Sequence, residues 1–203
     1  MPRAGLSRPA VVAAAAELVD EVGFDRLSLA ALAARLGVRL PSLYKHIDSL
    51  DGLRRDVAVL AVTELGAAMS GAATGLAGSD ALRSVAGAYR RYGHAHPGRY
   101  AATVRAPAAA DAEHTEAAGV VLRIVLAVLA GYGLAGNDAV DATRALRATL
   151  HGFVTLEAGG GFGMPVDVDR SYSRLVDGFD ATLHRWADTD QGSPTTGLES
   201  ASR

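Results

Sequence analysis

Residues 28–47 carry two short helical patterns separated by one glycine, and this arrangement constrains the fold more than any other feature. Ser28 precedes the first pattern and can cap a helix, because its hydroxyl can accept from the free N–H groups of the first turn. Gly37 ends it, where a chain that leaves a helix often needs the positive φ that glycine adopts without strain. Four apolar residues between them share one helical face: Leu29, Leu32, Ala33 and Leu36.

A second helix, predicted over residues 41–47, begins directly after this turn. Pro41 suits a first turn, because the N–H that it lacks would have no partner there. Leu43 and Ile47 are four residues apart and should face the first helix. The other face carries hydrogen-bond donors and the only lysine of the chain, which suit phosphate oxygens and base edges in a major groove: Ser42, Tyr44, Lys45 and His46. Periodicity alone is equally consistent with a plain helical hairpin that has a solvated face.

Three motifs of this segment form a known combination. They are Gly37-Val38, the run Leu-Tyr-Lys-His-Ile at 43–47, and the acidic, leucine-containing start of a long helix after it. Together they resemble the DNA-binding domain of the TetR family of transcriptional regulators, over roughly residues 7–60. Leu-Pro-Ser before Leu-Tyr is similar to members related to the tetracycline repressor itself. The resemblance implies that these residues contact DNA: Ser28, Arg39, Leu40, Pro41, Ser42, Tyr44, Lys45 and His46.

Two positions depart from the family pattern. Ile47 stands where the family usually has Phe, which keeps an apolar side chain there. Leu50 stands where many members carry a Lys that meets a phosphate, so one backbone contact is missing. Arg54 or Arg55, one helical turn further on, is a candidate replacement, and Arg39 is a candidate phosphate contact in the turn.

Composition fits a helical, intracellular protein. The 203 residues are 49% hydrophobic, enough for one or two compact domains, and the net charge of −2 argues against a protein that coats nucleic acid. Residues 1–55 are mildly basic, with eight Arg and Lys against six acids, and the rest is acidic. The absence of cysteine excludes a disulfide framework and fits the cytoplasm. Residues 117–135 could span a bilayer by length, but Arg123 near their centre favours a buried core helix.

The whole chain is predicted to be all-α, because no alternating strand pattern is present. In the first helix, Val12, Ala15, Ala16 and Val19 are expected to point inward. Residues 1–50 are expected to form a three-helix DNA-binding domain, 51–188 a helical effector-binding and dimerisation domain, and 189–203 a disordered tail. Helices are predicted at 9–22, 29–36, 41–47, 49–72, 80–95, 112–134, 138–158 and 167–187, with at most a short one at 100–104.

The last two predicted helices carry apolar stripes wider than one internal contact requires. In the TetR family the corresponding pair packs against its symmetry mate as a four-helix bundle, and two DNA-binding heads are held about 34 Å apart. The resemblance therefore implies a homodimer on a palindromic operator. The alternative is that both stripes belong to the internal core. The expected interface residues are Leu146, Leu150, Val154, Tyr172, Leu175, Val176, Phe179 and Leu183.

Tyrosines gather near the end of the predicted fifth helix, and such side chains suit a mostly apolar pocket with a few polar groups. The resemblance implies an effector pocket beside the long fourth helix, whose occupation changes the angle between the two heads. Ordinary packing of these residues is the alternative. The candidate lining residues are Leu65, Met69, Tyr89, Tyr92, Tyr100, Val104, Leu122, Leu126 and Phe153.

No catalytic, metal or cofactor site is expected. His94, His96 and His114 lack a helical ligand spacing, and the glycine run 159–163 lacks the lysine and the preceding strand of a phosphate loop. The leading hypothesis is a ligand-responsive transcriptional regulator, in its simplest form a repressor, that a small-molecule effector releases from DNA. The alternative is a helical small-molecule-binding or protein-interaction module without DNA binding.

Overall fold

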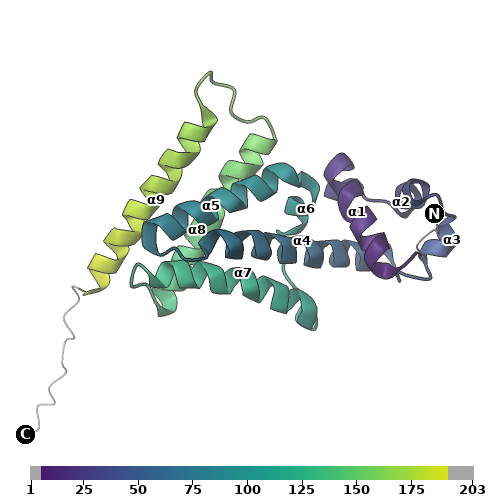
Figure 1. The fold of residues 1–203 in the computed structure, drawn as a ribbon, viewed down its shortest axis with the longest axis horizontal. Coiled ribbons are helices and arrows are strands. Elements are labelled where there is room, and N and C mark those ends of the chain that lie inside the picture. Colours follow the sequence, from purple (N-terminus) through teal and green to yellow (C-terminus); the bar gives the residue numbers. More distant parts are fainter. Residues whose placement is uncertain (1–5, 192–203) are drawn as a thin grey trace, which may run out of the picture.

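The computed structural model describes residues 6–191. All regular structure in this range is helical, which confirms the all-α prediction, and Figure 1 shows three short helices at one end joined by a long helix to a larger body. The elements are α1 (Arg8–Val22), a 3-10 turn (Phe24–Arg26), α2 (Leu29–Leu36), α3 (Leu40–Leu43), α4 (Leu50–Ala73), α5 (Gly78–Ala95), α6 (Pro97–Ala102), α7 (Ala112–Ala130), α8 (Gly136–Ala158) and α9 (Val168–Gln191). We call α1–α3 the head and α5–α9 the body.

Local signals start and stop the helices of the head. Serine hydroxyls cap α1, α2 and α4, with Ser28 Oγ accepting from the Ala31 N–H at 3.2 Å and Ser49 Oγ from the Gly52 N–H at 2.9 Å. Gly37 ends α2 at φ +65°, in the left-handed region. The next N–H, of Val38, then donates to the Ala33 carbonyl at 3.0 Å. The predicted helix–glycine–helix turn is therefore confirmed.

The second helix of this turn is shorter than predicted, because α3 ends at Leu43 and not at residue 47. Residues 44–46 form a turn in which the His46 and Ile47 N–H groups both donate to the Leu43 carbonyl. A single helical turn has little stability of its own. Burial of Leu43 and Ile47 holds the segment against α2, as their spacing predicted.

Other boundaries differ from the predicted ones by a few residues. The short helix of the body begins at Pro97, and α7 ends at Ala130, where Gly131 starts a turn. The last helix reaches Gln191, so residues 189–191 of the predicted tail are helical. The remainder of that tail, 192–203, lies outside the described residues. In α1 the fully buried valine is Val11, whereas Val12, which was expected inside, is partly exposed.

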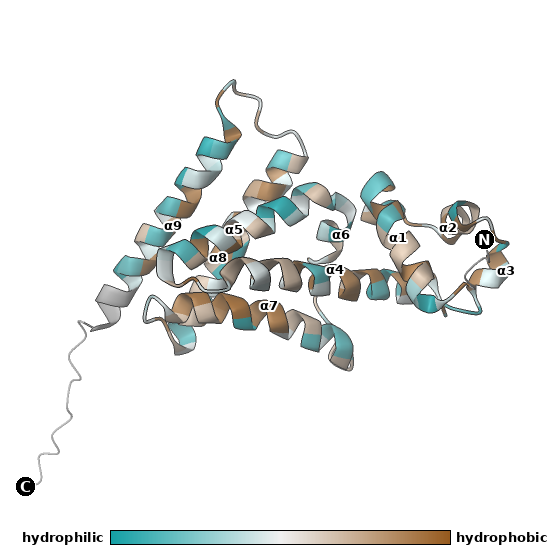
Figure 2. Cartoon of the chain, viewed as in Figure 1, coloured by the Kyte–Doolittle hydropathy of each residue, from teal (hydrophilic) through white to brown (hydrophobic). Residues whose placement is uncertain are grey.

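Two hydrophobic cores meet along α4. The core of the head is completed by residues of α4 and α6, among them Leu53, Val57 and Ala102, all fully buried. The C-terminal half of α4 contributes Leu65 and Met69 to the core of the body. Figure 2 shows apolar residues along α4 and α7 and many polar residues on α5 and α9. A single helix thus belongs to both cores.

Within the described residues, α4 is the one helix long and apolar enough to cross a membrane. It packs against α1 in the head and against α5 and α7 in the body. A central core helix of a folded protein has the same length and composition, so this feature does not indicate a membrane span.

Candidate DNA-reading and effector sites

The predicted DNA-binding residues from Arg39 to His46 lie in α3 and directly beside it, at the end of the head away from the body (Figure 1). Tyr44 is 53% exposed, and Arg39 and Lys45 are also exposed. Neither of these two cations has an ion-pair partner among residues 6–186, so both are available to an anion. Ser28 stands apart from this run, because its hydroxyl caps α2.

The two arginines proposed to replace the missing contact at Leu50 are engaged inside the protein. The Arg54 guanidinium donates to the Asp25 carbonyl at 3.2 Å and lies 3.7 Å from Asp51. Arg55 is turned toward α7 and the body. Among the candidates considered, Arg39 is the one whose guanidinium the protein leaves unpaired.

Arg55 is the centre of a charged cluster that joins three helices. Its guanidinium binds Asp111 at the start of α7, with Nε 2.7 Å from Oδ2, and it binds Glu113 at 2.6 Å. The pairing with Arg55 holds the pKa of Asp111 well below its usual range. Arg55 also contacts Asp56 at 3.0 Å, and Asp56 accepts from Arg8 of α1 at 2.9 Å. The start of α7 is therefore tied through α4 to the head.

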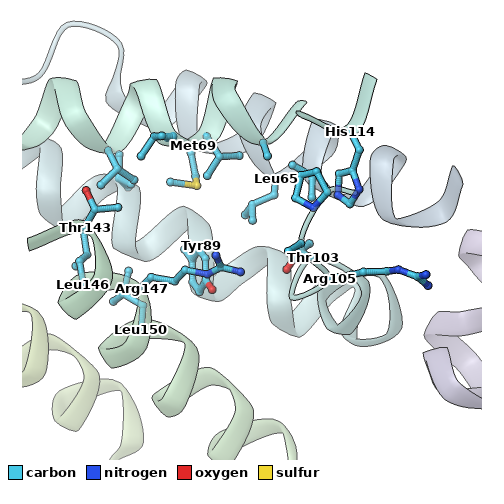
Figure 3. Close-up of a pocket in the computed structure, with 18 residues that line it drawn as sticks. Leu65, Met69, Tyr89, Thr103, Arg105, His114, Thr143, Leu146, Arg147 and Leu150 are labelled. Atoms are coloured by element: carbon cyan, nitrogen blue, oxygen red, sulfur yellow. The ribbon is translucent and has the colours of Figure 1, made fainter. Parts of the chain in front are cut away.

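A cavity of about 220 Å³ lies between α4, α5, α7, α8 and the loop after α6 (Figure 3). Four of the predicted pocket residues line it: Leu65, Met69, Tyr89 and Leu122. Sequence reasoning missed its other polar residues: Thr103, Arg105, His114, Thr143 and Arg147. Its remaining walls are aliphatic, with Val62, Val85 and Val125 among them.

Leu146 and Leu150 also line this cavity, although they were predicted to form a dimer interface. Their side chains line the cavity together with residues of α4, α5 and α7 (Figure 3), and both are buried within the single chain. An apolar stripe on a helix predicts burial but does not identify what covers it.

The other predicted pocket residues lie elsewhere. Tyr92 is buried outside the cavity, where its hydroxyl donates to Glu64 at 3.0 Å. Val104 is exposed on the surface, and Leu126 packs against the core of the body.

Tyr100 and Phe153 are buried in the core of the body and do not line the cavity. The Tyr100 hydroxyl hydrogen-bonds to the Tyr89 hydroxyl at 3.1 Å and to His151 Nδ1 at 2.7 Å. The Phe153 ring packs edge-on against Tyr172. Aromatic composition alone did not distinguish residues that line a cavity from residues that support its wall.

His114 is the most unusual residue of the cavity wall. It is 2% exposed, and its Nε2 has no hydrogen-bond partner among the described residues. Its backbone N–H donates to Asp111 Oδ1 at 3.0 Å, which places it in the first turn of α7 beside the Arg55 cluster. Burial lowers the pKa of the imidazole, so the ring is neutral near pH 7. The one sequence signal for it was a lone histidine before an apolar helix.

The remaining predicted dimer residues are also used inside the chain. Val154, Tyr172, Val176 and Leu183 are buried within the body. Leu175 and Phe179 are partly buried against the same core. The Tyr172 hydroxyl donates to the Ala86 carbonyl of α5 at 2.7 Å. The two stripes therefore pack largely inside the chain, against α5, α7 and each other, as the alternative of an internal core expects, and the dimer interface stays a prediction.

The three histidines considered as metal ligands have separate surroundings. His94 Nε2 lies 2.7 Å from Glu157, and His96 Nδ1 lies 3.3 Å from Asp20. His114 lines the cavity. Residues 6–186 contain no group of three or more side chains placed to hold a metal ion.

A helix-turn-helix head on an all-helical body is the architecture of a bacterial DNA-binding regulator. Residues 11–57 match the model of the bacterial regulatory proteins of the tetR family, and residues 82–179 match that of the tetracyclin repressor-like C-terminal domain. The chain is 41% identical over 174 residues to an uncharacterized HTH-type transcriptional regulator, Rv0681 of Mycobacterium tuberculosis, covering 85% of this chain and 79% of that one. It is 37% identical over 172 residues to YobS of Bacillus subtilis, also described as an HTH-type transcriptional regulator, covering 85% and 90%. The chain belongs to the TetR family of transcriptional regulators.

Solved structures show the same fold. A Rhodococcus protein of unknown function superposes with a TM-score of 0.75 at 27% identity, covering 91% of this chain and 99% of that one. A TetR variant from Acinetobacter baumannii, crystallised with minocycline, superposes with a TM-score of 0.68 at 24% identity, covering 90% and 99%.

Proposed function

We propose that this regulator is a ligand-responsive repressor that binds a palindromic operator as a homodimer in the cytoplasm and leaves it when a small molecule fills the cavity of the body. In this domain organisation, residues 1–50 bind DNA, and residues 51–188 bind the effector and form the dimer. The observation that carries the proposal is the position of His114, which lines the cavity and lies in the same helical turn as the Arg55 contacts.

A short series of polar contacts connects the cavity wall to the head. A ligand that displaces His114 moves the first turn of α7, and with it Asp111 and Glu113. Both carboxylates hold Arg55 of α4, whose neighbour Asp56 holds Arg8 of α1. Two arrangements of this cluster would give two positions of the head, and a ligand that favours one of them shifts the DNA affinity.

The operator contacts that we propose are exposed or partly exposed groups at the tip of the head. Lys45 and Arg39 would meet phosphates, while Tyr44 and His46 would reach base edges or sugars. All four groups belong to residues directly before or directly after α3. Because they are so close together, one head can contact one half-site of the operator.

The burial pattern supports a dimer interface on the outward faces of α8 and α9. The outward faces of α8 and α9 carry apolar and small residues that stay exposed or partly exposed within residues 6–186: Gly152, Leu156, Gly178 and Trp186. Leu156 is 54% exposed and Trp186 is 37% exposed. At the two glycines an added Cβ would meet no atom within 4 Å. A second copy packed on this face would bury these residues and fix the spacing of two heads.

A gel-shift assay on the DNA upstream of the protein's own gene tests the proposal. We expect a sequence-selective shift at physiological salt that unrelated competitor DNA does not abolish. If the protein binds this fragment and an unrelated one equally, and no genomic fragment is selected, the repressor proposal fails. The helical binding module without DNA recognition is then favoured.

A further inference from the structure

The polar residues of the cavity give it one sign of charge. Arg105 and Arg147 line it, and no carboxylate does so among the described residues. Neither guanidinium makes a hydrogen bond or an ion pair within residues 6–186. In Figure 3 the Arg147 side chain reaches along the cavity toward Tyr89, whereas Arg105 extends away from it. Arg147 is therefore the cation placed to meet a ligand.

His114 adds a neutral polar group to the wall of the cavity. His114 is neutral, and its Nε2 lacks a partner although the side chain is almost completely buried. A buried polar nitrogen left without a hydrogen bond is costly, so a ligand that supplies one gains affinity there. Depending on the tautomer, Nε2 can donate or accept, which suits a hydroxyl group.

The size and the walls of the cavity limit what lies between these two groups. An apolar cavity of about 150 Å³ holds one benzene molecule. At about 220 Å³, this cavity has room for one ring with a few substituent atoms. Aliphatic side chains such as Val62, Leu65 and Val125 form most of its wall.

We propose that the effector of this regulator is a small carboxylate with an apolar, ring-sized body, whose carboxylate binds Arg147 and whose far end hydrogen-bonds to His114. This inference rests on the proposed effector function of the cavity and adds the chemical class of the ligand. A guanidinium binds a carboxylate by charge-assisted hydrogen bonds, which are stronger than those to a neutral amide.

The electrostatics of neighbouring groups agree with this assignment. His151 Nδ1 lies 2.7 Å from the Tyr100 hydroxyl. Burial is the main cause that lowers the pKa of His151, and the charge of Arg147 is the second. Likewise, after burial, the charge of Arg105 is among the causes that lower the pKa of His114. Arg147 therefore acts on His151 as a positive charge, whereas at His114 the charge of Asp111 opposes the weaker effect of Arg105.

Matched ligand pairs test the carboxylate. The probes are benzoate, para-hydroxybenzoate and phenylpropionate at millimolar concentration, each beside its neutral amide, measured by calorimetry and thermal shift on the full chain. We expect each carboxylate to bind about tenfold more tightly than its amide, the difference that one charge-assisted contact supplies. We also expect para-hydroxybenzoate to bind more tightly than benzoate, because its hydroxyl reaches His114.

Three variants locate the two contacts. Arg147→Met should remove the preference for the carboxylate and leave amide binding unchanged. Arg105→Met is the matched control and should keep the preference, because that side chain extends away from the cavity. His114→Phe should abolish the advantage of the para-hydroxyl group. Circular dichroism melting shows whether each variant is folded.

Three results would overturn the inference: amides that bind as tightly as carboxylates, a preference that survives Arg147→Met, or no binding by any probe. A gel shift on the operator is measured separately in the same samples. Operator binding without carboxylate preference refutes the ligand class alone. Carboxylate binding without operator binding refutes the repressor proposal alone.

Discussion

Lys45 stands exposed just beyond α3, and the protein gives its ammonium group no carboxylate partner in the described residues. If it meets a phosphate, Lys45→Ala should weaken binding to all DNA sequences alike and lower the slope of log affinity against log salt by about one. Fluorescence anisotropy over a salt series measures both quantities. Arg123→Ala is the control, since Arg123 pairs with Glu116 in the body, 2.8 Å away. An unchanged slope for Lys45→Ala would remove the role assigned to it.

At Gly98, α6 lies directly against the backbone of α1. A Cβ at this position would lie 1.9 Å from the carbonyl oxygen of Val19 in α1. Gly98→Ala should therefore lower the free energy of unfolding by about 3 kcal/mol, because the backbone of α1 has to move. Gly71→Ala should instead raise the free energy of unfolding by up to about 1 kcal/mol, because Gly71 lies within a helix and an added Cβ would meet no atom within 4 Å. Urea unfolding measures both changes. Equal effects of the two substitutions would contradict this packing.

Single residues were predictable from sequence where their role is local. Ser28 and Gly37 act within a few residues of themselves, so neighbouring sequence is enough to assign a cap and a left-handed turn. His114 could not be found in this way. Its position in the cavity depends on α4 and α8, which are far from it in the chain, and a lone histidine carries no signal of that packing.

At the scale of elements, Glu157 ties α8 to α5, and its partner Arg90 ties α5 to α9. It accepts from Arg90 Nε of α5 at 2.8 Å and lies 2.7 Å from His94, while Arg90 also contacts Asp169 of α9 at 2.7 Å. Its hydrogen bonds with Arg90 lower the pKa of Glu157 from 4.5 to about 2. The carboxylate therefore stabilises the body fully above pH 4.5, and this contribution is lost as the pH falls toward 2.

Glu157→Gln should consequently lower the free energy of unfolding near neutral pH. Between pH 4.5 and 2, the free energy of unfolding should fall less for this variant than for the parent protein. Urea midpoints measured at a series of pH values test this. Glu116→Gln removes an exposed pair with Arg123 and should leave the pH dependence as it is. The idea fails if the Glu157→Gln curve runs parallel to that of the parent.

The helices themselves were predicted well because their periodicity and caps are local, but their partners were not. The stripes on α8 and α9 are apolar as predicted, and within one chain they pack against α5, α7 and each other. Which surface covers an apolar face depends on the path of the whole chain. For the same reason the length of α3 was overestimated, since burial of Leu43 and Ile47 does not require a continuous helix.

For the whole molecule, the outward face of α8 and α9 is the surface that we assign to the dimer. Leu156→Arg should convert the dimer to a monomer in analytical ultracentrifugation and weaken operator binding, while the melting of each folded chain persists. Val140→Arg is the matched control, because Val140 is also exposed on α8 but lies on the opposite side of the helix. A dimer that survives Leu156→Arg would place the interface elsewhere.

The core shared along α4 also limits how regulators of this architecture can be recombined. Leu53 and Val57 of α4, with Ala102 of α6, complete the packing under the DNA-reading helices. A fragment cut at residue 50 would keep all the residues that face DNA but lose the residues of α4 and α6 that complete the hydrophobic core of the head. We expect that it does not fold by itself. An exchange of DNA specificity between two such proteins therefore has to move the junction beyond Ala61 and keep the surface that receives α6. The unit that can be inherited or engineered is larger than the unit that touches DNA.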